Sequence, residues 1–162
     1  QIYESNSHTL KAGLSKVGIK EINFLKVADN LESVTGAIKI TQPFLGGAQM
    51  SKMTVKIYEY STGKSFTITV CGHRDGNSWY NVAAYQYGDT AANDITVRFG
   101  HDGTYNCIWI GEVGQVWSYP QVFITDIQNG YSSINATWNE NWTISFGLHL
   151  LKKLLNKLFP PF

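Results

Sequence analysis

Hydrophobic and polar residues alternate along much of this chain, most regularly between Lys52 and Cys71. Successive side chains of a β-strand point to opposite faces, so a period of two predicts strands with one apolar face. Residues 52–60 and 65–71 both follow this pattern, and a short polar connection containing Gly63 joins them. That arrangement predicts a β-hairpin. Its apolar face is expected to hold Met53, Val55, Ile57, Phe66, Ile68 and Val70.

Further short strands are predicted on either side of this hairpin. The polar run 72–77, the run 100–104 with its two glycines and the pair Asn129-Gly130 are expected turns. Many short strands separated by turns predict an all-β fold, an antiparallel β-sandwich of jelly-roll-like type. These strands are expected at residues 34–41, 79–87, 95–99, 105–110, 121–127 and 142–146, with less regular ones between 14 and 27.

The pattern changes to helical spacing after residue 147. Apolar residues recur every three or four positions, with lysines between them, which predicts a short amphipathic helix over residues 148–159. We expect the helix to pack on the domain or on copies of itself. Alternatively, the helix contacts a membrane surface, or the segment is an appended peptide. Membrane contact is expected nowhere else in the chain. The residues concerned are Leu148, Leu151, Lys152, Leu154, Leu155 and Leu158.

These changes in pattern predict three parts. Residues 1–33 are expected to form a neck that connects to an upstream part of a longer protein, because the chain begins with Gln1 and not with Met. Residues 34–146 are the expected β-sandwich domain, and residues 147–162 are the helix and tail.

Composition narrows the classes of partner. Charged residues make up only 15% of the chain, and the net charge is +1. This charge creates too weak an electrostatic field to attract nucleic acid. No segment reaches the roughly 20 apolar residues that a membrane-spanning helix needs. We expect no nucleic-acid partner and no cofactor.

The two cysteines, Cys71 and Cys107, fall in predicted strands. A disulfide between neighbouring strands or a pair of metal ligands is one interpretation. We favour two buried thiols that act as small hydrophobic side chains, because two distant cysteines in a chain of this size do not make a disulfide framework.

Candidate acid or base residues are Asp75, Asp102 and Glu112, with His73 and His101 close to them in sequence. A pair of carboxylates can hydrolyse a glycosidic bond. However, aspartates in turns usually bond to their own backbone, and no established catalytic or metal-binding spacing is present. We therefore expect neither a catalytic nor a metal site, and keep a surface-polysaccharide hydrolase as the alternative.

Aromatic residues are abundant, with five tryptophans and nine tyrosines, and several flank predicted loops. Aromatic rings beside amide and hydroxyl side chains form adaptable binding surfaces, and rings can stack on the C–H face of a sugar. Core packing explains at least half of these aromatic residues. The expected ligand-binding residues are Asn77, Trp79, Tyr80, Trp117, Tyr119, Trp138 and Asn139.

Several segments resemble the C-terminal domains of tail fibres from bacteriophages and phage-tail-like particles. They are residues 53–67, 98–104, 108–112, 117–120 and 142–146, and the similarity covers about residues 36–146. Residues 147–162 depart from the family's pattern. No catalytic residue carries over from the resemblance.

The resemblance implies a homotrimeric, β-rich tip of a tail fibre, made in the cytoplasm of the bacterial host and carried on the virion. Such a tip would bind a saccharide or an outer-membrane protein on the bacterial surface. A trimerisation or folding cap without a ligand is a further alternative. Self-association also fits residues 79–87, whose bulky side chains on both faces require a second cover, which another sheet or a neighbouring subunit can provide.

Overall fold

A computed structural model of the chain describes residues 20–22, 26–29, 32–43, 47–60, 63–88, 95–130 and 141–147. Every regular element in these ranges is a β-strand and every pairing is antiparallel, which confirms the prediction of an antiparallel all-β fold. The expected helix over 148–159 lies outside these ranges. Within them, no helix has the length and hydropathy that crossing a membrane requires.

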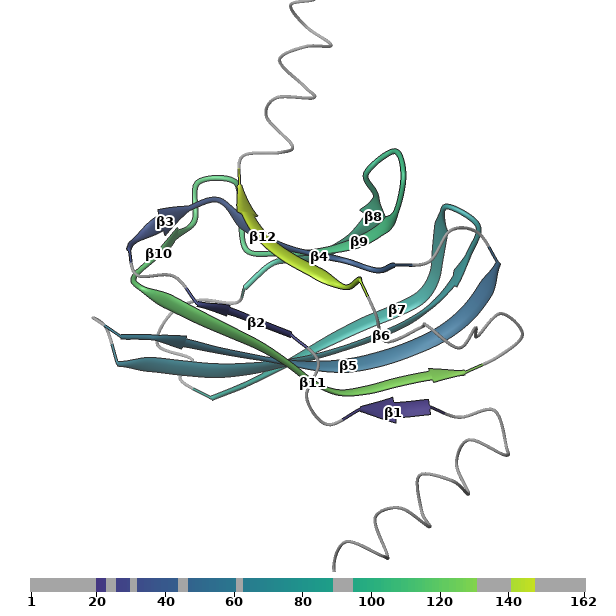
Figure 1. Ribbon diagram of the computed structural model, residues 1–162, viewed down its shortest axis with the longest axis horizontal. Helices are drawn as coiled ribbons and strands as arrows, with labels where there is room; N and C mark the ends of the chain where they lie inside the picture. Colours follow the sequence, from purple (N-terminus) through teal and green to yellow (C-terminus); the bar gives the residue numbers. More distant parts are fainter. Residues whose placement is uncertain are drawn as a thin grey trace, which may run out of the picture.

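The strands form two sheets stacked in two layers, with a two-stranded ribbon at one end (Figure 1). The large sheet has the order β1-β11-β5-β6-β7, and β2 also pairs with β11. Its members are β1 (Lys20–Ile22), β2 (Lys26–Asp29), β5 (Ala48–Glu59), β6 (Lys64–Asp75), β7 (Ser78–Gly88) and β11 (Pro120–Gly130).

The small sheet has the order β12-β4-β9-β8, and β3 pairs with β10 in the ribbon. The small sheet consists of β4 (Ala37–Thr41), β8 (Val97–His101), β9 (Asn106–Ile110) and β12 (Thr143–Gly147), and the ribbon of β3 (Val34–Thr35) and β10 (Val116–Trp117). Two stacked antiparallel sheets agree with the expected sandwich, while its jelly-roll-like connectivity stays a prediction.

The predicted central hairpin is β5 and β6, which pair without interruption from Glu59 and Lys64 to Ala48 and Asp75. Alternate residues of both strands face the small sheet and are buried, including all six of the expected apolar residues. They join Ile38, Ile40, Ile108 and Ile110 of the small sheet in one core cluster. We call the opposite side of the large sheet its outer face; Met50, Lys52, Thr54, Lys56 and Tyr58 lie on it.

One expected turn is shorter than predicted and another is absent. Only Gly76 and Asn77 of the run 72–77 form a turn, because β6 continues to pair with β5 as far as Asp75. Asn129-Gly130 is not a turn either, because both residues pair with β5 at the end of β11. In each case cross-strand pairing outweighs the local turn preference of polar residues. β1 and β2, within the expected neck of residues 1–33, pair with β11 of the sandwich.

Two strands beside the central hairpin each contain one extra residue. β11 shifts register against β5 between Thr125 and Gln128, and β7 shifts against β6 opposite Cys71 and His73. Asp126 and Asn81 adopt left-handed φ angles of 52° and 49° at these points. Both are β-bulges, in which two residues oppose one. Asp and Asn are the residues besides glycine that tolerate this conformation best.

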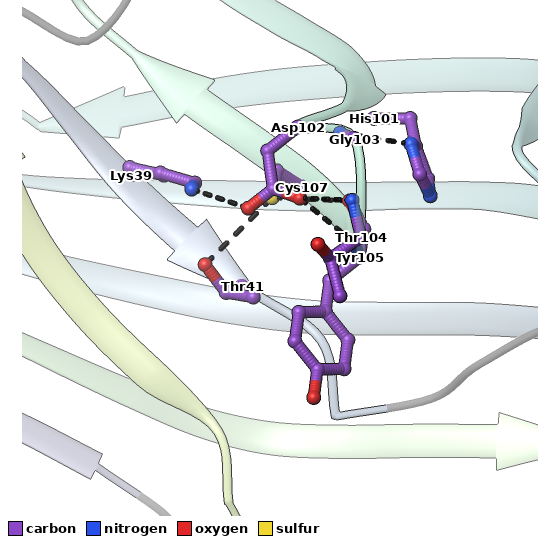
Figure 2. A network of polar contacts seen from close by, with 8 residues as sticks. All are labelled: Lys39, Thr41, His101, Asp102, Gly103, Thr104, Tyr105 and Cys107. Carbon is purple, nitrogen blue, oxygen red and sulfur yellow. Dashed lines mark hydrogen bonds and ion pairs between the residues drawn. The ribbon is translucent and has the colours of Figure 1, made fainter.

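A polar network ties the β8–β9 turn to β4 (Figure 2). One Asp102 carboxylate oxygen accepts from Lys39 Nζ at 2.6 Å, and the other accepts the N–H groups of Thr104 and Tyr105 at 2.8 Å. Burial raises the pKa of the Asp102 carboxyl, but these hydrogen bonds and the Lys39 charge outweigh it and hold the pKa well below its ordinary value. Asp102 therefore stabilises the folded chain as a carboxylate.

Gly111 provides a test of core packing around Trp117. Its φ of +84° is left-handed, and a Cβ placed on it would lie 2.8 Å from the Trp117 ring. We expect Gly111→Ala to reduce the free energy of unfolding by about 1–3 kcal/mol and to change Trp fluorescence. Gly114→Ala is the control, because a Cβ there meets no atom within 4 Å. Equal effects of the two substitutions in urea denaturation would contradict this account.

The Asp102 network provides a second test. Asp102→Asn should reduce the free energy of unfolding at pH 7 by about 1.5–3 kcal/mol, because hydrogen bonds to a charged group are lost. A carboxyl with a lowered folded-state pKa stabilises above its unfolded pKa of about 4 and stops doing so as pH falls. The difference in the free energy of unfolding between wild type and Asp102→Asn should therefore become smaller below about pH 4.

Glu112→Gln is the matched control for Asp102→Asn. Glu112 pairs with Arg98 at 2.7 Å, but the pair is exposed. Because solvent screens this pair, Glu112→Gln should reduce the free energy of unfolding by less than Asp102→Asn does. Urea denaturation followed by circular dichroism at pH 7 and pH 3 measures both variants. If Asp102→Asn reduces the free energy of unfolding at pH 7 by no more than Glu112→Gln does, the structural role of the network is refuted.

Candidate functional site

An open pocket of about 630 Å³ lies at one end of the large sheet. This is the end near the β6–β7 turn, where β5, β6 and β7 curl toward the small sheet, on the right in Figure 1. We call it the outer pocket. It is lined by Met50, Ser51, Lys52, Cys71, Gly72, His73, Asn81, Gln128, Asn129 and Gly130.

Strand register places the chemically useful side chains around the outer pocket. Lys52 lies opposite Cys71, and Met50 lies opposite His73, all on the outer face. His73 in turn lies opposite Tyr80 of β7, and the centres of the two rings are 6.4 Å apart. Tyr80 is 53% exposed and Met50 is 58% exposed. The pocket therefore has an accessible aromatic and apolar margin.

Both bulges border the outer pocket. Asn81, the left-handed residue of the β7 bulge, lines it directly, and Gln128 and Asn129 follow the bulge of β11. Gly72 makes room for the β7 bulge, because a Cβ there would come within 3.0 Å of the Trp79 and Val82 side chains. The amides at this site thus depend on an interrupted strand alternation.

The pocket lining combines amides with basic groups. Its lining residues include Lys52 and His73 and no aspartate or glutamate. Asn81 and Gln128 supply its amide side chains, whereas the Asn129 side chain shares the inner face with Ser51, its partner on β5, and is only 1% exposed. The arrangement suits a polar, uncharged or acidic ligand better than a cation.

The expected ligand-binding residues do not form a single site. Asn77 is exposed in the β6–β7 turn and Tyr80 lies next to the outer pocket, whereas Tyr119 lies at the other end of the sheet. The twelve residues of β5 span the distance between these ends, about 35 Å. Trp138 and Asn139 lie outside the described residues.

Two of the expected binding tryptophans pack against the core. Trp117 has no exposed surface, and its indole N–H donates to the carbonyl of Gly36 at 2.8 Å. Trp117 is therefore wrong as a ligand-contacting residue, since a buried indole with its polar atom bonded cannot reach a ligand. Trp79 is half-buried, packs edge-on against Phe99, and donates to the carbonyl of Gly100 at 3.1 Å.

Tyr119 belongs to a second exposed aromatic pair. Its ring meets that of Tyr60 edge-on, with 6.3 Å between ring centres, and its φ is 51°. The N–H of the preceding residue, Ser118, donates to the Glu59 carboxylate at 2.7 Å and helps to hold this strained position. The pair remains a candidate contact surface, separate from the outer pocket.

The three candidate acids have different surroundings. Asp75 is exposed at the end of β6, Asp102 is bonded to Lys39, and Glu112 is bonded to Arg98. The hydrogen bond from Arg98 holds the pKa of Glu112 below its ordinary value. None of the three lines the outer pocket. Among the residues the structure describes, no group of three His, Cys, Asp or Glu side chains could hold a metal ion.

Both cysteines are free thiols. Cys107 is buried on β9, and burial raises the pKa of its thiol to about 11, which makes it unreactive. This fits the interpretation of a thiol that acts as a small hydrophobic side chain. Cys71 differs, because it is half-buried on the outer face and lines the outer pocket.

Sequence reasoning missed most of the outer pocket. Met50, Lys52, Gln128 and Asn129 were not among its candidates, and His73 was assigned to a turn. The alternation of β5 does place Met50 and Lys52 opposite the buried residues, so the strand pattern offered a signal for these two. The amides that follow a bulge offered none.

No model of a known protein family matches this chain, and no protein of curated function matches it in sequence. Two solved structures are similar in part. The tailspike protein of Acinetobacter phage vB_ApiP_P1 aligns with TM-score 0.37 and 17% identity, over 70% of this chain and 22% of that one. The tailspike protein of Acinetobacter baumannii phage AM24 aligns with TM-score 0.39 and 15% identity, over 81% of this chain and 29% of that one.

This chain therefore spans less than a third of the length of either tailspike chain.

Proposed function

We propose that this chain is a receptor-binding part of a phage tail fibre, located at its distal tip on the virion, and that a bacterial surface saccharide binds in the outer pocket. The observation that carries this proposal is the open pocket on the outer face, with Tyr80 and Met50 exposed at its margin. The resemblance of residues 36–146 to tail-fibre C-terminal domains supports the same assignment.

The chemistry of the pocket favours a saccharide over an outer-membrane protein. Sugar hydroxyls need both donors and acceptors, and the amides of Asn81 and Gln128 supply both. The faces of Tyr80 and His73 offer stacking surfaces beside them. A protein partner would usually bury about 800 Å² on each side, whereas a pocket of about 630 Å³ has the size of a small-molecule site.

A glycan array probed with the full chain tests the proposal. We expect one class of bacterial surface saccharide to be retained, and Tyr80→Ala to weaken its binding about two- to tenfold, since a lost aromatic contact is worth about 0.5–1.5 kcal/mol. Gln128→Ala should also weaken binding. Tyr60→Ala, an exposed tyrosine at the opposite end of the sheet, is the control and should bind like wild type.

Three other outcomes would each contradict the proposal. New reducing ends in the bound saccharide would favour the polysaccharide hydrolase, with Asp75, Asp102 or Glu112 as its acids. Retention of outer-membrane protein with no saccharide bound would assign a protein receptor. Absence of any binding, together with loss of fibre assembly when the domain is deleted, would favour the trimerisation or folding cap.

The oligomeric state of the tip is a separate part of the proposal. The family resemblance implies a homotrimer, and exposed Val116 of the ribbon offers apolar surface for a subunit contact. We expect light scattering to give the mass of three chains for the full chain. If a chain truncated after Gly147 also has the mass of three chains, residues 148–159 are accessory to assembly. If only the full chain has that mass, residues 148–159 are the oligomerisation element. A monomer in both would overturn the trimer.

A further inference from the structure

We propose that the outer pocket is one end of a longer binding face along β7, and that its ligand is a polysaccharide bound over several sugar units rather than by a terminal sugar. This inference rests on the proposed saccharide binding and names the form of the saccharide. The face consists of Tyr80, Tyr85 and Tyr87 of β7 with Thr67 and Thr69 of β6, and we call it the tyrosine face.

The β7 bulge brings the three tyrosines onto one face. Tyr80 and Tyr85 are five positions apart, so uninterrupted alternation would put them on opposite sides of the sheet. The extra residue at Asn81 shifts the alternation by one. Tyr80 then lies opposite His73, and Tyr85 lies opposite Thr69, all on the outer face. A one-residue change in register is the physical origin of the tyrosine face.

The tyrosines are available to a ligand. Tyr80, Tyr85 and Tyr87 are 53%, 55% and 59% exposed. Thr69 and Thr67, half-buried on β6, lie opposite Tyr85 and Tyr87. The Tyr85 and Tyr87 rings therefore each have a hydroxyl group on the neighbouring strand, and such a pair can stack on a sugar ring and bond its hydroxyls. Lys56, on the next strand, is the nearest charged residue in the Tyr87 row.

The length and charge of the face indicate a polymer. From Tyr80 to Tyr87 the strand advances about 20 Å, several times the width of one sugar ring. None of the eleven residues of β7 carries a full charge, so contacts along it depend on stacking and hydrogen bonding. Those contacts suit a repeating, hydroxyl-rich chain that continues from the outer pocket.

The experiment measures affinity against ligand length. The probes are a disaccharide, a tetrasaccharide and an octasaccharide cut from the array polysaccharide that the full chain retains. For wild type we expect affinity to rise about tenfold or more from the shortest to the longest probe. The Tyr85→Ala/Tyr87→Ala variant should bind the disaccharide like wild type and lose most of that rise. Tyr85→Phe/Tyr87→Phe should keep it, because the rings remain.

The two proposals fail in different ways. Equal affinity for all three lengths in wild type, with the double alanine variant unchanged, would overturn the extended face and leave the outer pocket intact. A changed solution mass of the double alanine variant would assign the tyrosines to a subunit contact and also overturn it. Absence of any retained saccharide on the array would overturn the saccharide proposal itself. Circular dichroism checks that the double variant, which changes only exposed rings, remains folded.

Discussion

The uninterrupted pairing of β5 with β6 is the constraint on which the rest of the structure depends. Twelve residues of each strand pair in register, and alternate ones must face the small sheet to bury the core. Shifting either strand by one residue would expose the whole apolar set. The flanking strands β7 and β11 adapt to this fixed pair, and each does so by inserting one residue. Both irregularities of the large sheet thus follow from the regularity at its centre.

The bulges give each flanking strand two phases of alternation. In β11, Ile124 and Ile127 are three positions apart, yet both have no exposed surface because Asp126 shifts the phase between them. In β7 the same device puts Tyr80 and Tyr85 on the outer face. The residues released from strict pairing, Asn81 and those after Asp126, border the outer pocket. Core packing and site formation therefore share one mechanism in this sheet.

The sequence pattern predicted the strands that alternate and could not predict the points where alternation fails. The β5–β6 and β8–β9 hairpins were readable because apolar residues recur at every second position. Gly72 to Asp75 looked like a turn because polar residues dominate there, although Arg74 is fully buried between the sheets. Trp117 looked available because it flanks a loop. Its burial depends on Gly111 and Gly36, and a glycine carries no side chain that would signal such a contact. Gly36 is also distant from Trp117 in sequence.

The position of β7 explains why its side chains, and not its backbone, are suited to make contacts. It is an edge strand among the described residues, without charge or proline, the kind of edge that invites pairing with another strand. The bulge at Asn81 breaks the even row of backbone groups that such pairing needs. A partner strand would match only part of β7, whereas a ligand lying across the outer face meets tyrosine rings on both sides of the break. The bulge thus disfavours strand addition and at the same time aligns the rings that a ligand can contact.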